Sequence, residues 1–186
     1  MGERKSMKAA AQTVRIRRFE TRDAKPVSDL VMRTLRISNT KDYALELIEG
    51  LMPEQQPERF IERAEDMHFY VAEACSRADP GTNEPGQDPV SVPSEIIGCA
   101  GIRKDAEDPE RTDIHSFYVK PERQKEGIGR RIMETLEQDE YFLQTKRTLI
   151  HASITAADFY RRLGYDFKDG LAVLDRYQLY TMVKYH

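Results

Sequence analysis

The segment of residues 117–131 constrains the fold more than any other part of the chain. It begins with an apolar run that ends at Val119, turns at Pro121, and reaches Gly127 and Gly129 just before a helical pattern starts. The apolar residues that follow are spaced to share one face of a helix. A strand that leads through a glycine-bearing loop into a helix predicts an α/β domain.

The loop in this segment has the chemistry of a phosphate-binding site. A helix N-terminus offers about four unpaired backbone N–H groups and a partial positive charge. Glycine at this position lets the backbone approach a phosphate closely. Arg130 and Arg131 add positive charge at the same end. We interpret the loop as a cradle for a pyrophosphate.

The two glycines alone do not establish that interpretation. No Gly-Lys-Ser/Thr follows, so the loop is not a nucleotide-binding P-loop. The third glycine of a dinucleotide fingerprint is replaced by Ile132. On the glycines alone, a helix start that binds no ligand remains an equal alternative.

A second block of residues makes the interpretation much more specific. The two blocks together resemble the GNAT superfamily, the Gcn5-related N-acetyltransferases, whose motifs are Val-x-Pro with Gln/Arg-x-x-Gly-x-Gly/Ala, and Asn-x-x-Ala-x-x-Phe-Tyr-x-x-x-Gly-Phe. Ser153 stands where the family usually has Asn, which puts one cofactor contact in doubt, and Tyr165 replaces the usual Phe. The matching residues are Val119-Lys120-Pro121 with Gln124-Lys125-Glu126-Gly127-Ile128-Gly129, and Ser153-Ile154-Thr155-Ala156-Ala157-Asp158-Phe159-Tyr160-Arg161-Arg162-Leu163-Gly164-Tyr165.

The resemblance implies one domain over residues 13–186. Its mixed, mostly antiparallel sheet would have six to seven strands, splay between the fourth and fifth strands, and be flanked by about four helices. The order of strand and helix patterns along the chain agrees with such an α/β (mixed α+β) fold. Residues 1–12 lack apolar periodicity and are expected to form a flexible tail. Residues 76–94 are rich in Pro and Gly and are expected to form a loop insertion between the second and third strands.

The resemblance also implies the co-substrate acetyl-CoA and the residues that bind it. Backbone groups of residues 117–119 would hold the pantetheine arm, and residues 124–130 would hold the pyrophosphate. Ser153 and Tyr160 would face the cofactor from the other side. The implied cofactor-binding residues are Phe117, Tyr118, Val119, Gln124, Lys125, Glu126, Gly127, Ile128, Gly129, Arg130, Ser153 and Tyr160.

Three residues are the leading candidates for catalysis, and a fourth is weaker. In many family members the residue that matches Tyr160 protonates the leaving thiolate, and the same tyrosine could also be a core aromatic on an amphipathic helix. Attack by an amine requires its neutral form, so a general base is expected. His115 and Asp113 are the best candidates. Some family members have a Glu or His where Asp113 stands and a His where His115 stands, and histidine has the natural pKa for this task. The two residues are two apart on an expected strand, so they share a face. His151, at the end of the fifth expected strand, is a weaker third candidate.

Composition narrows the remaining function classes. Lys and Arg total 29 and Asp and Glu total 32, a formal net charge of −3, which disfavours a general nucleic-acid-binding protein. No apolar stretch reaches the roughly 18 residues of a membrane helix, and no secretory signal is visible. We therefore expect a cytoplasmic protein with no nucleic-acid or membrane partner. The two cysteines cannot form a zinc site alone, and no metal is expected.

The expected activity is acetyl transfer from acetyl-CoA to a primary amine of a small molecule, peptide or protein, by direct attack in a ternary complex. The alternative is a catalytically silent GNAT-fold module that senses an acyl-CoA or takes part in assembly. Residues 37–66 are rich in Asp and Glu, which could form a wall for a cationic amine or simply a solvated helix face. Tyr43, Phe60, Tyr177 and Tyr180 could line an acceptor pocket or pack in the core. Exposed sheet edges would also allow a homodimer.

Overall fold

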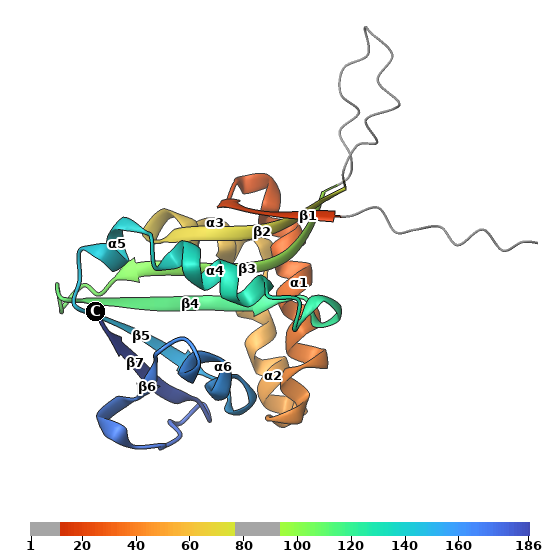
Figure 1. Cartoon of the computed structure of the whole chain (residues 1–186). Coiled ribbons are helices and arrows are strands. Elements are labelled where there is room, and N and C mark those ends of the chain that lie inside the picture. The colour runs from red at the N-terminus through yellow and green to blue at the C-terminus, as the bar shows by residue number, and fades with distance from the viewer. Residues whose placement is uncertain (1–11, 77–93) are drawn as a thin grey trace, which may run out of the picture.

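A seven-stranded sheet forms the centre of the protein, for which a computed structural model describes residues 12–76 and 94–186 (Figure 1). The strand order is β1-β2-β3-β4-β5-β7-β6. Every neighbouring pair is antiparallel except β4 and β5, which are parallel. The strands are β1 (Gln12–Arg18), β2 (His68–Ser76), β3 (Glu95–Lys104), β4 (Arg111–Val119), β5 (Arg147–Ala152), β6 (Asp166–Phe167) and β7 (Tyr180–Tyr185).

Six α-helices accompany the sheet within the described ranges, two more than the four or so expected. The region expected to hold one broken helix has two, because a new helix begins at Pro57, a residue that fits the first turn. The other additional helix is only four residues long. The helices are α1 (Ala24–Ile37), α2 (Leu45–Leu51), α3 (Pro57–Asp66), α4 (Ile128–Leu136), α5 (Glu140–Leu143) and α6 (Ala157–Arg161).

Each face of the sheet has its own hydrophobic core. On one face, Ile132 of α4 is buried with Ile102 and with residues of α5 and α6. On the other face, Val31 of α1 is buried with Phe69 and with residues of α2 and α3. We call these the α4 face and the α1 face (Figure 1).

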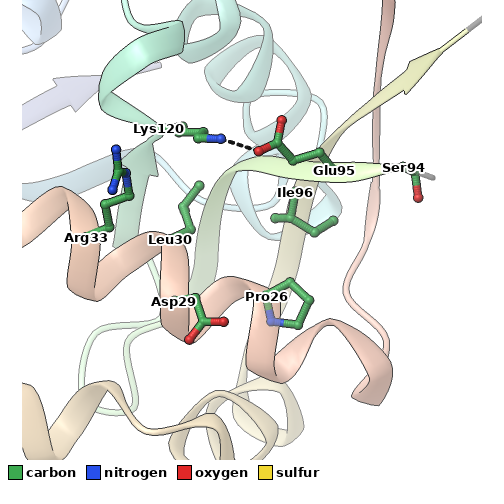
Figure 2. Close-up of a pocket in the computed structure, with 8 residues that line it drawn as sticks. All are labelled: Pro26, Asp29, Leu30, Arg33, Ser94, Glu95, Ile96 and Lys120. Carbon is green, nitrogen blue, oxygen red and sulfur yellow. Dashed lines mark hydrogen bonds and ion pairs between the residues drawn. The ribbon is translucent and has the colours of Figure 1, made fainter.

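A small hollow of about 320 Å³ lies between α1 and β3, and its charged groups are paired (Figure 2). Lys120 forms an ion pair with Glu95 across the hollow. Arg33, which also lines it, forms an ion pair with Glu122. Because these charges already have partners, the hollow is a poor candidate for a charged ligand.

The parallel pairing of β4 with β5 is short. It joins residues 111–114 to residues 147–150. Beyond that ladder, β4 continues through residues 115–119 and β5 through residues 151–152 with no pairing between them. The sheet therefore opens between these two strands, and the expected separation of the fourth and fifth strands is confirmed.

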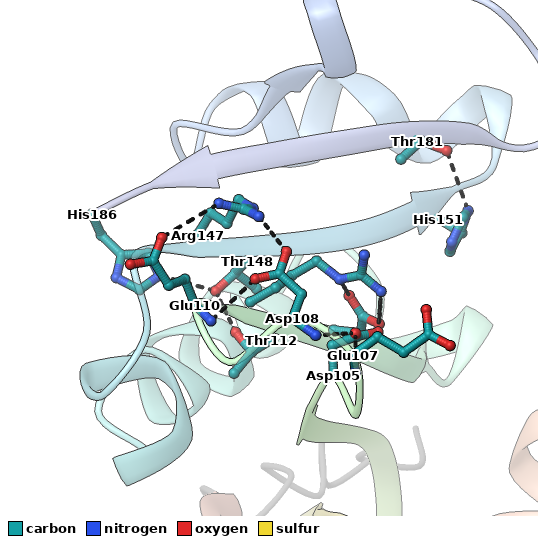
Figure 3. Close-up of polar contacts among 12 residues, drawn as sticks. Asp105, Glu107, Asp108, Glu110, Thr112, Arg147, Thr148, His151, Thr181 and His186 are labelled. Atoms are coloured by element: carbon teal, nitrogen blue, oxygen red, sulfur yellow. Dashed lines mark hydrogen bonds and ion pairs between the residues drawn. The ribbon is translucent and has the colours of Figure 1, made fainter.

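Polar contacts hold the closed end of this strand pair together (Figure 3). The hydroxyl groups of Thr112 and Thr148 lie 2.7 Å apart in a fully buried position. Arg147 forms an ion pair with Asp108 in the loop that precedes β4. The two strands are thus fixed at one end and separate at the other.

A β-bulge in β4 lies where the strands separate. Gly101 of β3 pairs with His115, but Cys99 pairs with Tyr118, so β4 has one more residue than β3 between these two pairs. Ser116 takes up the additional residue with a φ of +50°, and its carbonyl accepts a hydrogen bond from Cys99 Sγ. The bulge allows His115 and Tyr118 to lie on the α1 face together.

The fold expected from the sequence is confirmed in its mixed, mostly antiparallel sheet of seven strands and in its opening between β4 and β5. The predicted tail (residues 1–12) and the predicted insertion (residues 76–94) lie almost wholly outside the described residues.

Gly101→Ala should destabilise the fold. A Cβ at this position would lie 2.3 Å from Met67 Sδ and 2.9 Å from a ring carbon of Phe69, and both side chains are buried. Relieving such crowding costs about 1–3 kcal/mol. Gly50→Ala is the control, because its Cβ would meet nothing within 4 Å and alanine favours a helix by about 0.5–1 kcal/mol. Urea unfolding measures both, and a Gly101→Ala protein as stable as the wild type would contradict the packing.

Candidate active site

A cavity of about 870 Å³ follows the opening between β4 and β5. It passes through the sheet, since Phe159 lines it from the α4 face and Leu35 lines it from the α1 face. We therefore distinguish two ends. The α4 end comprises Gln124, Lys125, Gly127, Gly129, Arg130, Ser153, Phe159, Tyr160, Arg162 and Leu163, and the α1 end comprises Thr34, Leu35, Tyr43, Leu47, Ile48, Leu51, His151, Tyr177 and Leu179.

The α4 end is built by the loop before α4 and by the first turn of that helix. Gly127 is the N-cap of α4 with a φ of +82°, a left-handed conformation that costs other residues about 1–2 kcal/mol. No side chain caps the helix, so its first amides remain open. A Cβ at Gly129 would lie 3.2 Å from Phe159 and would narrow the cavity. Open amides and free space of this kind suit a phosphate.

The charges that line the cavity are unevenly distributed. Lys125, Arg130 and Arg162 line it at the α4 end. Among the described residues that line the cavity, none is Asp or Glu. The α4 end therefore attracts anions, as a pyrophosphate site must.

Tyr160 lies on α6 and is 4% exposed. Its ring packs edge-on against Phe117, with 5.8 Å between ring centroids, and against Phe159 at 5.1 Å. Burial raises the pKa of the Tyr160 phenol, so the hydroxyl keeps its proton at neutral pH. Tyr160 is thus a core aromatic whose side chain, with its hydroxyl protonated, also lines the cavity.

The structure brings most of the predicted cofactor-binding residues together. Two do not line the cavity: Glu126 forms an ion pair with Arg123, and Ile128 is buried in the core of the α4 face. Those that line it are Phe117, Tyr118, Val119, Gln124, Lys125, Gly127, Gly129, Arg130, Ser153 and Tyr160.

His115 lies on the α1 face but is not among the residues that line the cavity. Its Nε2 is buried, and no hydrogen-bond partner for it exists among the described residues. Burial lowers the pKa of His115 to about 4, and the charges of Arg103 and Arg63 act in the same direction. The imidazole is therefore neutral at pH 7.

Asp113 also lies outside the cavity lining. Its Oδ1 is 3.1 Å from Arg111 Nε, and its Oδ2 accepts a hydrogen bond from the same guanidinium. The structure therefore does not bring the two predicted bases into the cavity wall.

His151 is the histidine that lines the cavity. Its Nδ1 lies 3.5 Å from Thr181 Oγ1 (Figure 3) and 3.7 Å from Asp175 Oδ2. From the sequence, His151 is only a weaker candidate, because its place at the end of a strand does not indicate that Asp175 is its neighbour. That neighbour follows only from the pairing of β5 with β7 and from the turn before β7.

At the α1 end, the acidic residues between positions 37 and 66 agree with the solvated-face alternative, and two of the four aromatic candidates line the cavity. None of the acidic residues between positions 37 and 66 lines the cavity. Of the four candidate aromatics, Tyr43 and Tyr177 line it, whereas Phe60 is fully buried in the core and Tyr180 packs against the core of the α4 face. Aromatic residues thus contribute to this end, and carboxylates do not.

Within residues 12–76 and 94–186, no helix is long and apolar enough to cross a membrane. In the same ranges, no group of three or more His, Cys, Asp or Glu residues is placed to hold a metal ion.

Comparisons with known proteins identify the family of the chain and solved structures that share its fold. A family model described as "Acetyltransferase (GNAT) domain" matches residues 65–166. A search of curated proteins found no match.

Solved structures share the fold. PaiA N-acetyltransferase from Thermoplasma acidophilum, in complex with coenzyme A, is similar with a TM-score of 0.70 and 17% identity, over 94% of this chain and 99% of that one. A GCN5-related N-acetyltransferase from Rhodopseudomonas palustris gives a TM-score of 0.64 and 19% identity, over 99% and 100%. N-acetylglutamate synthase from Neisseria gonorrhoeae, complexed with coenzyme A and L-arginine, gives 0.54 and 15%, over 96% of this chain but 34% of that one.

His115 should make the fold less stable in acid. Its pKa is about 4 in the folded protein and 6.5 in an exposed histidine, so the unfolded chain binds the proton first as the pH falls. The stability that comes from burying the neutral ring is present above pH 6.5 and is lost between pH 6.5 and pH 4, by about 3 kcal/mol in total.

The measurement is the free energy of unfolding of the wild type and of His115→Gln from pH 7 to pH 4. The difference between the two free energies of unfolding at each pH reports the titration of His115, because the carboxylates titrate in both proteins. Parallel pH profiles would show that His115 is not buried as described.

Proposed function

The chain belongs to the GNAT acetyltransferase family, and on that premise we propose that it transfers an acetyl group from acetyl-CoA to a primary amine. The observation that carries the proposal is the cavity through the β4–β5 opening, with open amides and three cations at one end and Tyr160 in its wall. A small molecule, a peptide or a protein could supply the amine. The coenzyme A complexes of two structural neighbours support the choice of donor.

The α4 end would hold the phosphates of the donor. The first amides of α4 and the side chains of Lys125 and Arg130 would bind the pyrophosphate. Arg162 extends the positive lining, and Ser153, which directly follows β5, would meet the cofactor. The backbone of residues 124–130 would bind the pyrophosphate. The side chain of Glu126 pairs instead with Arg123, and that of Ile128 is buried in the core.

The edge of β4 would bind the pantetheine arm. Beyond Ile114 this edge has no strand partner, so backbone groups of residues 117–119 can bond to an extended chain of amides. Gln124 Nε2 already donates to the carbonyl of Val119 at 3.2 Å. The arm would therefore take the place of a strand in the opening and direct the thioester toward Tyr160.

Acetyl-CoA, when bound, supplies the acyl group and a thiolate leaving group. The amine nitrogen forms a bond to the acetyl carbon and the carbon–sulfur bond breaks. Tyr160 Oη donates a proton to the departing sulfur, for which its raised pKa keeps it protonated. A base on the α1 face removes the proton that the nitrogen loses, and the products are the acetylated amine and coenzyme A.

We assign the base to His115, whose neutral, unpartnered Nε2 is free to accept a proton through a bridging water. Asp113 is the second candidate base, although its ion pair with Arg111 makes its carboxylate less available to accept a proton. His151 is the alternative, because it lines the cavity and has Asp175 at 3.7 Å to stabilise an imidazolium. A homodimer and a cytoplasmic location stay predictions.

Tyr160→Phe should lower kcat for acetyl transfer by about 10²- to 10⁴-fold, the usual contribution of a general acid. The KM for acetyl-CoA should change little, because the ring is retained. Tyr165→Phe is the matched control, since it removes a buried hydroxyl that does not line the cavity. Thiol release with a panel of amines measures both variants. Full activity of Tyr160→Phe would remove the acid assignment, and binding of acetyl-CoA with no turnover would favour the silent module.

His115→Gln and His151→Gln should separate the two candidate bases. We expect His115→Gln to lower kcat by at least about 100-fold and His151→Gln to have a smaller effect. Rates are measured at saturating acetyl-CoA from pH 6 to pH 9. If the loss is confined to His151→Gln, the role of base passes to His151.

A further inference from the structure

The α1 end of the cavity is neutral and mostly apolar. Its described lining contains no Lys, Arg, Asp or Glu, and its titratable groups are His151 and two tyrosines. Burial raises the pKa of one of these, Tyr43, to about 12, so its phenol stays neutral. The apolar side chains there are Leu35, Leu47, Ile48, Leu51 and Leu179.

Two carboxylates lie next to this end, and both are engaged. Asp42 Oδ2 accepts hydrogen bonds from the amide and the hydroxyl of Thr155, at 3.1 and 2.8 Å. Asp175 Oδ1 accepts from the amides of Tyr177 and Leu179, at 2.8 and 3.0 Å, while its Oδ2 faces His151. Hydrogen bonds within this chain hold both carboxylates in place without cancelling their charge, and neither side chain lines the cavity.

This charge distribution selects among acceptor classes. A polyamine would bring a second ammonium into an end that has no acid in its lining, and a buried unpaired charge is costly. An amino acid would bring a carboxylate, but the cations Lys125, Arg130 and Arg162 lie at the α4 end. The acceptor that fits has one ionisable group, the amine that attacks.

Hydrogen bonds across the cavity also limit the size of the acceptor. Tyr43 Oη donates to the carbonyl of Gln178 at 3.2 Å, and Asp42 bonds to Thr155. The segment after α1 is thereby joined to the segment after β5 and to the turn before β7. A polypeptide could pass beyond the α1 end only by breaking these bonds, whereas a small molecule could lie beneath them.

We propose that the acceptor is a small primary monoamine with an alkyl or aryl body and no carboxylate. The proposal rests on the proposed acetyl transfer and specifies its second substrate. The apolar body packs against Leu47, Leu51 and Tyr177, and the nitrogen lies at the β4–β5 opening, where it can reach the thioester. Burial of the body supplies the binding energy that charged groups supply in a polyamine site.

The test is thiol release from acetyl-CoA with a fixed panel of acceptors. The panel contains phenethylamine, hexylamine, spermidine, phenylalanine, and a pentapeptide that begins with phenylalanine. We expect kcat/KM for one of the two monoamines to exceed that for spermidine and for phenylalanine by about 100-fold, the cost of one unpaired polar or charged group. The pentapeptide should be a poor substrate.

A charge placed in the α1 end should change that preference. Leu47→Glu should lower kcat/KM for the monoamines by about 10-fold or more and raise it for spermidine, because the new carboxylate can pair with the second ammonium. Leu51→Glu is a second variant at a more exposed position of the same helix. Glu46→Gln is the control, since Glu46 is exposed on α2 and does not line the cavity.

Calorimetric titration with acetyl-CoA is run on the wild type and on every variant. It separates a failure to bind the donor from a wrong choice of acceptor. If the wild type does not bind acetyl-CoA, the proposed function itself fails. If acetyl-CoA binds and spermidine, phenylalanine or the pentapeptide is the best substrate, the monoamine proposal is overturned and acetyl transfer stands. Binding of acetyl-CoA with no acetylation of either monoamine also overturns it. Retained acetyl-CoA affinity in Leu47→Glu shows that a changed preference does not come from unfolding.

Discussion

The short parallel ladder between β4 and β5 is the constraint on which the rest of the structure depends. Thr112 and Thr148 hold the two strands together at one end, and pairing stops after Ile114 and Ile150. The opening beyond that point exposes a strand edge in the middle of the sheet, where unpaired backbone groups need partners. A cavity with a polar edge and apolar walls is the direct result.

The opening connects two surfaces of opposite character. On the α4 face, the N-terminus of α4 and three cations provide an environment for an anion. On the α1 face, leucine and tyrosine side chains provide a neutral one. The bulge at Ser116 supports this division, because it sets which β4 side chains turn to each face. The sheet therefore separates the charged donor of the proposed reaction from its amine acceptor.

Local patterns in the sequence predicted the α4 end well. The loop at residues 124–129 and the block at residues 153–165 are each continuous in the sequence, so their resemblance to the two family motifs could be seen without a structure. The helix α5 was missed because its four residues have no periodicity, although Asp139 caps it by accepting a hydrogen bond from the amide of Tyr141.

The α1 end could not be predicted in the same way. Leu47 and Tyr177 line the same cavity only because α2 packs on one side of the opening and the turn before β7 lies on the other side. Glutamates on α2 suggested an acidic wall, but the helix turns its apolar face inward and leaves these residues exposed. The partner of His151 likewise depends on the pairing of β5 with β7. Such contacts join segments that are far apart in the sequence, so the pattern of residues within one segment does not predict them.

Thermal unfolding of the full chain with increasing acetyl-CoA tests the central claim most directly. A donor that binds only the folded state stabilises it by about 2.7 kcal/mol at 100 times its dissociation constant, which raises Tm by several degrees. Our account predicts saturable stabilisation by acetyl-CoA and by coenzyme A, and a weaker effect of pantetheine, which lacks the pyrophosphate. Unchanged Tm at millimolar acetyl-CoA would contradict the assignment of the β4–β5 opening as its binding site.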